Sequence, residues 1–133
     1  MPTRRSKIIV YVPLSHADAV RTAIGEAGGG KLGKYSFCSF STRGIGRFRP
    51  DTGAKPHIGT VGKLEEVEEE RIEVLCDEPF VEAVVAAIKK IHPYEEVALD
   101  VYKLELYNLS VINPACVRLP EISREGCFLI LKK

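Results

Sequence analysis

Short apolar runs alternate with polar, glycine-bearing connections along the chain, and this pattern predicts alternating strands and helices. Residues 7–13 (KIIVYVP) are rich in β-branched side chains and end at a proline, which is typical of a buried strand. A helix follows, with Ser15 as its expected N-cap and three consecutive glycines, residues 28–30, at its end. Its buried face is predicted from apolar residues at helical spacing: Ala17, Val20, Ile24 and Ala27.

The middle of the chain reads as two further strands. Residues 35–42 (YSFCSFST) alternate apolar side chains with serine and predict a second strand, which Gly44 and Gly46 are expected to interrupt. A ribbon can resume at residues 47–50, and residues 51–63 are rich enough in glycine and proline to form a long connection. Residues 65–76 alternate with period two, which predicts a half-solvated third strand.

A second helix and a fourth strand complete the pattern. Pro79 suits the first turn of a helix that Pro93 ends, and its expected core stripe is Phe80, Val84, Ile88 and Ile91. Residues 97–106 alternate again. The order β-α-β-β-α-β predicts the α+β class, as a ferredoxin-like sandwich whose antiparallel sheet carries two helices on one face.

The last part of the chain does not fit this plan. We therefore divide the chain into a ferredoxin-like domain, residues 1–106, and an extension of uncertain structure, residues 107–133. The extension contains the apolar run 127–131 (CFLIL), which would promote aggregation if it were exposed. It must pack on its own domain, cover a sheet edge or lie in a subunit interface, and the sequence does not choose among these.

Composition narrows the class of protein. The 133 residues include 19 basic and 18 acidic side chains, a net charge of +1, which argues against a nucleic-acid or membrane partner recruited by bulk charge. The apolar stretch 8–12 is too short for a secretory signal, and no run reaches the roughly 20 apolar residues of a membrane helix. None of the four cysteines forms a CxxC pair, so we expect a cytoplasmic protein with reduced thiols.

The strongest candidate for chemistry is the segment 92–96 (HPYEE). It places one imidazole and two carboxylates at a helix-to-strand turn, where His92, Glu95 and Glu96 can bind a divalent metal or handle a proton. His57 in the long connection is a further candidate ligand. The alternative is that His92 caps the helix C-terminus and the glutamates are solvated.

Two charged stretches and one cysteine are weaker candidates. Arg47 and Arg49 alternate on a possible strand beside Phe48, which suits a phosphate or RNA contact but equally a charge-protected edge strand. The acidic run 65–70 fits a solvated strand or a partner from another subunit for those arginines. Cys38 has no histidine close in sequence, so we expect a core cysteine rather than a nucleophile.

Several of these segments together resemble a known family. Residues 92–104 (HPYEEVALDVYKL) look like the signature of the domain inserted in the NGG-interacting-factor-three family, and residues 11–13, 33–35, 38–39, 46–50, 56 and 58–59 match in order and spacing. The resemblance spans about residues 7–106 and identifies the chain as a stand-alone version of that insert. It implies a fold like the trimeric CutA and PII types. The family's dinuclear metal site belongs to its flanking domains, so no metal-hydrolase residue is implied here.

We therefore predict a non-catalytic binding or assembly module that forms a homo-oligomer, a dimer or a trimer, and senses a small ligand. No residue is expected to be catalytic. The candidate ligand-binding residues are His92, Tyr94, Glu95, Glu96, Arg47 and Arg49. One alternative is a divalent-metal-binding protein or metal-dependent enzyme that uses His92, Glu95 and Glu96. A second is a PII-like nucleotide-binding regulator, and a protein partner, including a larger member of the same family, is left open.

Overall fold

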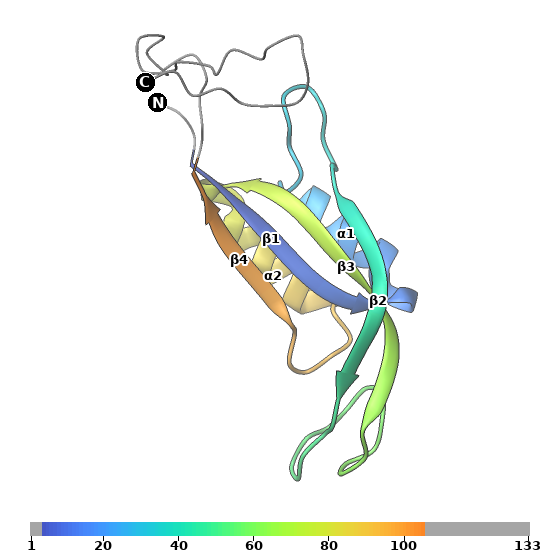
Figure 1. The fold of residues 1–133 in the computed structure, drawn as a ribbon. Coiled ribbons are helices and arrows are strands. Elements are labelled where there is room, and N and C mark those ends of the chain that lie inside the picture. The colour runs from blue at the N-terminus through green and yellow to red at the C-terminus, as the bar shows by residue number, and fades with distance from the viewer. Residues whose placement is uncertain (1–3, 106–133) are drawn as a thin grey trace, which may run out of the picture.

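A computed structural model describes residues 4–105 of the chain, which form one sheet and two helices (Figure 1). The element order is β-α-β-β-α-β, as predicted, with a short 3-10 turn before each helix. The elements are β1 (Arg5–Pro13), η1 (Leu14–His16), α1 (Ala17–Glu26), β2 (Phe40–Phe48), β3 (Glu65–Asp77), η2 (Glu78–Phe80), α2 (Val81–Ile91) and β4 (Leu99–Leu104).

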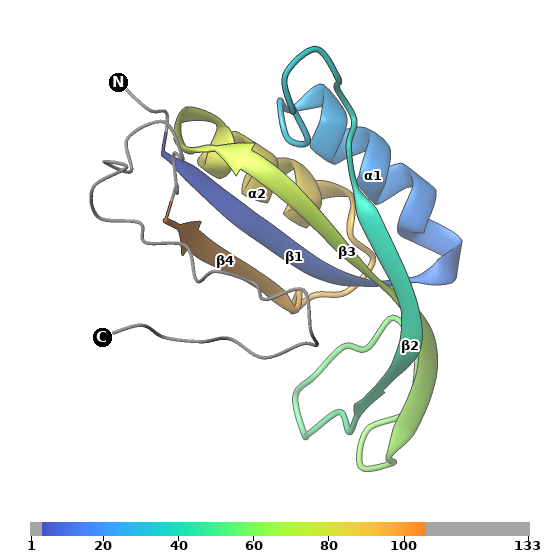
Figure 2. The same ribbon diagram turned by 45° about the horizontal axis from the view of Figure 1, so that its top comes forward.

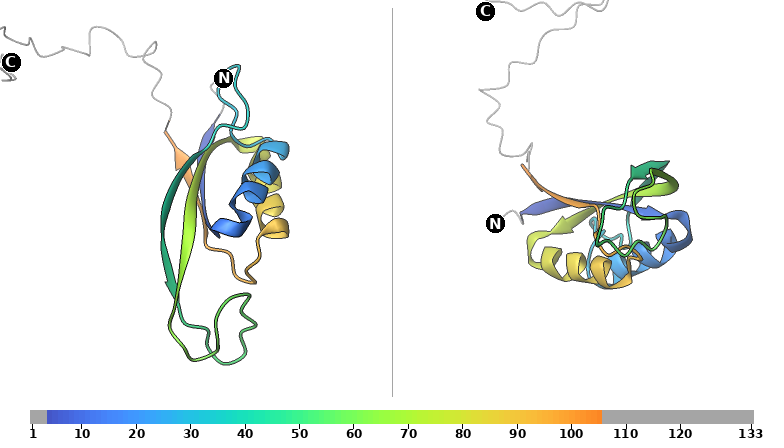
Figure 3. Two further views of the ribbon diagram at one scale, coloured as in Figure 1. Left: turned by 90° about the vertical axis from the view of Figure 1, so that its right-hand side faces the viewer. Right: turned by 90° about the horizontal axis from the view of Figure 1, so that it is seen from below.

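The sheet is antiparallel throughout, with strand order β2-β3-β1-β4. The apolar strand β1 lies inside the sheet, and its Ile8 is paired with Val74 of β3 and with Val101 of β4. Both helices cover the same face of the sheet (Figure 3). This is the ferredoxin-like sandwich that the sequence predicts.

The core lies between that face and the helices. β1 and β3 contribute every second side chain, and each helix contributes the side chains of one face. These strand and helix side chains pack together in a single layer. The core residues that the sequence assigned to α1, Ala17, Val20 and Ile24, are buried, as are Val84 and Ile88 of α2.

Three expectations about the helices are wrong. Ser15 is not an N-cap, because it lies within η1 and α1 begins only at Ala17. The Ser15 hydroxyl is hydrogen-bonded to the ring of His16 instead (Oγ to Nδ1, 2.8 Å). Phe80 and Ile91 do not belong to the core stripe: both are exposed, and Phe80 lies in η2 before the helix starts.

The second strand begins later than predicted. β2 runs from Phe40 to Phe48, so the expected glycine interruption is wrong: Gly44 and Gly46 lie inside the strand and pair with β3. Pairing over nine residues outweighs the weak strand propensity of glycine. Cys38 precedes the strand and is only half-buried, so the expectation of a core cysteine fails there, whereas Cys76 of β3 is buried.

The β2–β3 hairpin continues past the other strands, because residues 65–68 of β3 pair only with β2 (Figures 1 and 2). β4 lies within the predicted span 97–106 but covers only Leu99–Leu104. Within residues 4–105, no helix is long and apolar enough to cross a membrane. The predicted extension, residues 107–133, lies outside the described residues.

Candidate functional site

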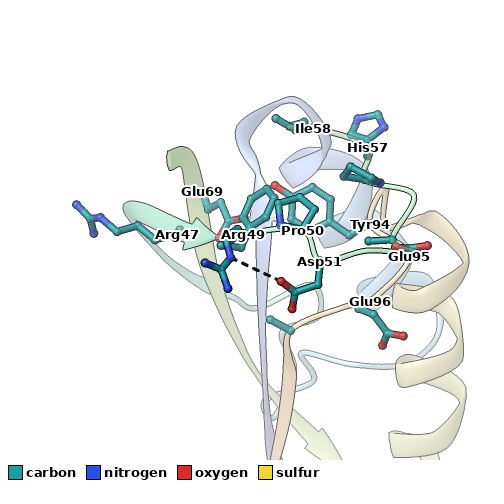
Figure 4. Close-up of a pocket in the computed structure, with 15 residues that line it drawn as sticks. Arg47, Arg49, Pro50, Asp51, His57, Ile58, Glu69, Tyr94, Glu95 and Glu96 are labelled. Atoms are coloured by element: carbon teal, nitrogen blue, oxygen red, sulfur yellow. Dashed lines mark ion pairs between the residues drawn. The ribbon is translucent and has the colours of Figure 1, made fainter. Parts of the chain in front are cut away.

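A pocket of about 460 Å³ lies beside the β2–β3 hairpin, where the connection after β2 approaches the loop between α2 and β4 (Figure 4). It is built from three segments that are far apart in sequence. Its lining consists of Gly46, Arg47, Phe48, Arg49, Pro50, Asp51, Ala54, Pro56, His57, Ile58, Glu69, Tyr94, Glu95, Glu96 and Ala98. All the predicted ligand-binding residues except His92 are among them.

His92 instead anchors the loop that forms one wall. It ends α2 in an extended conformation and is only 6% exposed. Its Nδ1 accepts the backbone N–H of Tyr94 (3.1 Å), which leaves Nε2 to carry the proton and donate to the carbonyl oxygen of Tyr11 (2.8 Å). Burial lowers the pKa of His92, against the smaller opposing effect of the Tyr11 hydrogen bond. The neutral ring therefore ties this loop to the end of β1.

Glu95 joins the two loops that face each other across the pocket. Its carboxylate Oε1 accepts the backbone N–H of Lys55 at 2.9 Å. Lys55 belongs to the long connection after β2, so this single bond links residues 40 positions apart. Glu95 and Glu96 remain exposed at the pocket rim.

The two predicted arginines do not act as a pair. Arg47, on β2, binds Glu66 of β3 (Nε to Oε1, 3.0 Å) and points away from the pocket in Figure 4. Arg49 follows the strand and faces Asp51 (Nε to Oδ1, 3.6 Å). The acidic run thus supplies the partner of Arg47 within the chain, whereas the sequence suggested such a partner from another subunit.

Aromatic rings form the floor around Tyr94. Its ring centroid lies 5.1 Å from that of His92, 5.9 Å from Phe48 and 6.4 Å from His57. His57 in turn contacts His16 at 5.8 Å, so all three histidines of the sequence gather here. Sequence reasoning suspected His57 but missed His16, which has no motif around it and reaches the cluster only through the turn η1.

The environment of Glu69 differs most from what the sequence predicts. Glu69 is 9% exposed although it comes from a run of glutamates expected to be solvated. A Cβ at position 46 would overlap its carboxylate, so Gly46 leaves the space that Glu69 occupies. The pairing of β2 with β3 puts Glu69 and Phe48 on one side of the hairpin.

The hydroxyl of Tyr94 lies near this carboxylate. It is buried and has no hydrogen-bond partner among residues 4–105. Burial raises the pKa of Tyr94, and the negative charge of Glu69 raises it further. The pocket thus contains a buried carboxylate and a buried neutral phenol side by side.

Two of the three candidate metal ligands, His92 and Glu95, make other hydrogen bonds in this structure. Both ring nitrogens of His92 are engaged in hydrogen bonds, and Glu95 binds a backbone amide. Among the described residues, no group of three or more His, Cys, Asp or Glu side chains could hold a metal ion.

The chain is similar to part of several larger proteins. It is 52% identical over 99 residues to the "GTP cyclohydrolase 1 type 2 homolog" of Bacillus subtilis and 46% identical over 98 residues to that of Mycobacterium leprae. Each match covers 74% of this chain but 26% of the relative, so the chain spans about a quarter of their length. No family model matches the chain.

Solved structures agree with the sequence matches. The crystal structure of a Bacillus cereus protein related to NIF3 superposes with a TM-score of 0.68 at 44% identity, over 78% of this chain and 26% of that one. CutA from Archaeoglobus fulgidus, a periplasmic divalent cation tolerance protein, gives a TM-score of 0.56 at 17% identity, over 80% of this chain and 89% of that one. The CutA match, at this identity, bears on the fold alone.

Proposed function

Because the chain carries a CutA-like domain that it shares with Nif3-related proteins, we propose that it is a binding module that assembles with copies of itself through β2. The observation that supports this most directly is the open edge of that strand. Within residues 4–105, β2 is hydrogen-bonded to β3 on one side only, and most of its nine residues are exposed. An unpaired edge of this length presents a row of backbone donors and acceptors to another strand.

The edge is only lightly protected against pairing. β2 contains no proline, and of its two arginines, Arg43 and Arg47, the second is already bound to Glu66. Phe40 is 66% exposed and Ile45 is 50% exposed. Large apolar side chains on an exposed edge are costly in a monomer and become favourable when a second copy covers them.

The oligomeric state of the whole chain tests this proposal. Sedimentation equilibrium, or light scattering after gel filtration, should give a mass above 14.7 kDa at micromolar concentration. Ile45→Lys should reduce that mass to the monomer value, because it puts a charge into the paired edge. Ile91→Lys is the matched control: Ile91 is similarly exposed, at 41%, but lies on α2 away from the edge, so the mass should not change.

Two results would overturn the assembly proposal. One is a wild-type chain that stays monomeric up to about 100 µM, well above the micromolar affinities of ordinary complexes. The other is an Ile45→Lys variant that is folded by circular dichroism and keeps the wild-type mass.

The pocket favours a second function, the binding of a small ligand. Its volume of about 460 Å³ lies within the roughly 300–1,000 Å³ range of small-molecule sites. Its walls come from two loops that the Glu95–Lys55 hydrogen bond joins, and His92 ties one of these loops to the end of β1. Loops held in this way have less freedom to lose when a ligand binds.

A further inference from the structure

We propose that the pocket binds a small organic cation, a primary amine or guanidinium compound, with Glu69 as its counter-ion and the rings of Tyr94 and Phe48 as its walls. This rests on the ligand-binding function proposed above and specifies the chemical class of the ligand. It does not depend on assembly through β2.

The first argument is that Glu69 lacks a charged partner. Glu69 is only 9% exposed and lines the pocket, yet no lysine, arginine or histidine forms an ion pair with it among residues 4–105. The hydroxyl of Tyr94 lies beside this carboxylate but carries no charge to balance it. A buried carboxylate is costly unless it is paired. A cation in the pocket would supply the missing partner.

The second argument is the balance of charge around the pocket. The two arginines of the lining are already used: Arg47 binds Glu66, and Arg49 faces Asp51. Glu95 and Glu96 at the rim add negative charge that the lining does not compensate. This lining attracts a cation and repels a phosphate, which disfavours a nucleotide in this pocket.

The third argument separates an organic cation from a metal ion. A metal requires several ligands at one point, and the described residues offer no such group. An organic cation requires one carboxylate and suitable surfaces for its carbon atoms. The rings of Phe48 and Tyr94, 5.9 Å apart, present such surfaces, and aromatic faces attract ammonium and guanidinium groups.

The buried hydroxyl of Tyr94 completes the site. It has no hydrogen-bond partner among the described residues, and it lies next to the carboxylate that would hold the cation. A bound amine or a water molecule that accompanies it can satisfy this group.

Agmatine, which carries both a primary amine and a guanidinium group, is the probe for isothermal titration of the whole chain. We expect agmatine to bind and to raise the melting temperature in a concentration-dependent way. Glu69→Gln keeps the size of the side chain and removes its charge, so the dissociation constant should weaken at least tenfold. Glu66→Gln is the matched control, because Glu66 lies on the same strand but is exposed and faces Arg47. The affinity of this variant for agmatine should stay within about twofold of the wild-type value.

A second variant keeps the proposal testable if Glu69→Gln folds poorly. Tyr94→Phe retains the ring and removes the hydroxyl, so agmatine binding should weaken by less than in Glu69→Gln. Glu69→Gln in the absence of ligand should melt above the wild type, because the substitution removes an unpaired buried charge.

The outcomes separate this inference from the function on which it rests. ATP or Zn²⁺ binding that Glu69→Gln abolishes, without any agmatine binding, would overturn the cation class and leave a ligand site in this pocket. No binding of agmatine, ATP or Zn²⁺ would overturn both the class and the ligand-binding function. Equal agmatine affinity in wild type and Glu69→Gln would show that the cation binds elsewhere, and would also overturn the inference.

Discussion

Replacing His92 with alanine tests whether this residue anchors the loop that contains the HPYEE segment. If His92 anchors the loop, the variant should lose stability whether or not any ligand is present. If His92 is instead a ligand-binding or metal-binding group at a solvated turn, the variant should keep its stability and lose binding. The two readings therefore predict different measurements from one substitution.

The magnitude follows from the contacts of the ring. His92→Ala removes two hydrogen bonds, one to the carbonyl of Tyr11 and one from the N–H of Tyr94. Each is worth about 0.5–1.5 kcal/mol, and a backbone group left without a partner costs more, so we expect a loss of about 2–4 kcal/mol. For a domain of this size that corresponds to a melting temperature roughly 10–25 °C lower.

The assay is thermal and urea unfolding followed by circular dichroism at one fixed protein concentration, because self-association makes stability depend on concentration. His57→Ala is the matched control: the same substitution at an exposed histidine of the same cluster should cost less than about 0.5 kcal/mol. A His92→Ala variant as stable as His57→Ala would refute the anchor.

The pH dependence provides an independent check on the same residue. The folded-state pKa of His92 is lowered below its ordinary value of 6.5, so the unfolded chain binds the proton more readily than the folded one. The contribution of the neutral ring is therefore fully present above pH 6.5 and is lost as the pH falls through the folded pKa. Between about pH 5 and 7, wild-type stability should fall more steeply with acid than that of His92→Ala.

Two further comparisons test the packing. Ile88→Ala should cost about 2–5 kcal/mol in urea unfolding because Ile88 is fully buried, whereas Ile91→Ala should cost under about 1 kcal/mol, and equal losses would contradict the assigned core stripe. Gly30→Ala should destabilise more than Gly33→Ala in thermal unfolding. Both glycines have positive φ, but only a Cβ at Gly30 meets the backbone of Cys38, so equal effects would contradict that close approach.

The fold was largely predictable because the buried faces of its strands and helices leave a regular apolar pattern in the sequence. β1 and the stripe of α2 at Val84 and Ile88 are visible in the sequence, since their apolar periods match the face that each element buries. The order of elements follows from them. β2 was misplaced for the converse reason: it is an exposed edge strand whose limits depend on pairing with β3, and an exposed strand has no strong apolar pattern.

The site divides in the same way. The sequence marked Arg47, Arg49 and the HPYEE segment, and the structure brings both arginines and the last three residues of that segment to one pocket. It could not assign the role of His92, because whether a ring caps a helix or binds a ligand depends on what lies across from it, here the carbonyl of Tyr11.

Glu69 shows what the tertiary structure alone decided. In the sequence it is one glutamate in an acidic run, and nothing local distinguishes it from Glu68 beside it. The alternation of the strand, the missing side chain at Gly46 and the distant ring of Tyr94 together bury one carboxylate and leave its neighbour in solvent. The sequence determined which elements form, since their patterns are local. The polarity of the pocket was decided by packing among segments that only the folded chain brings together.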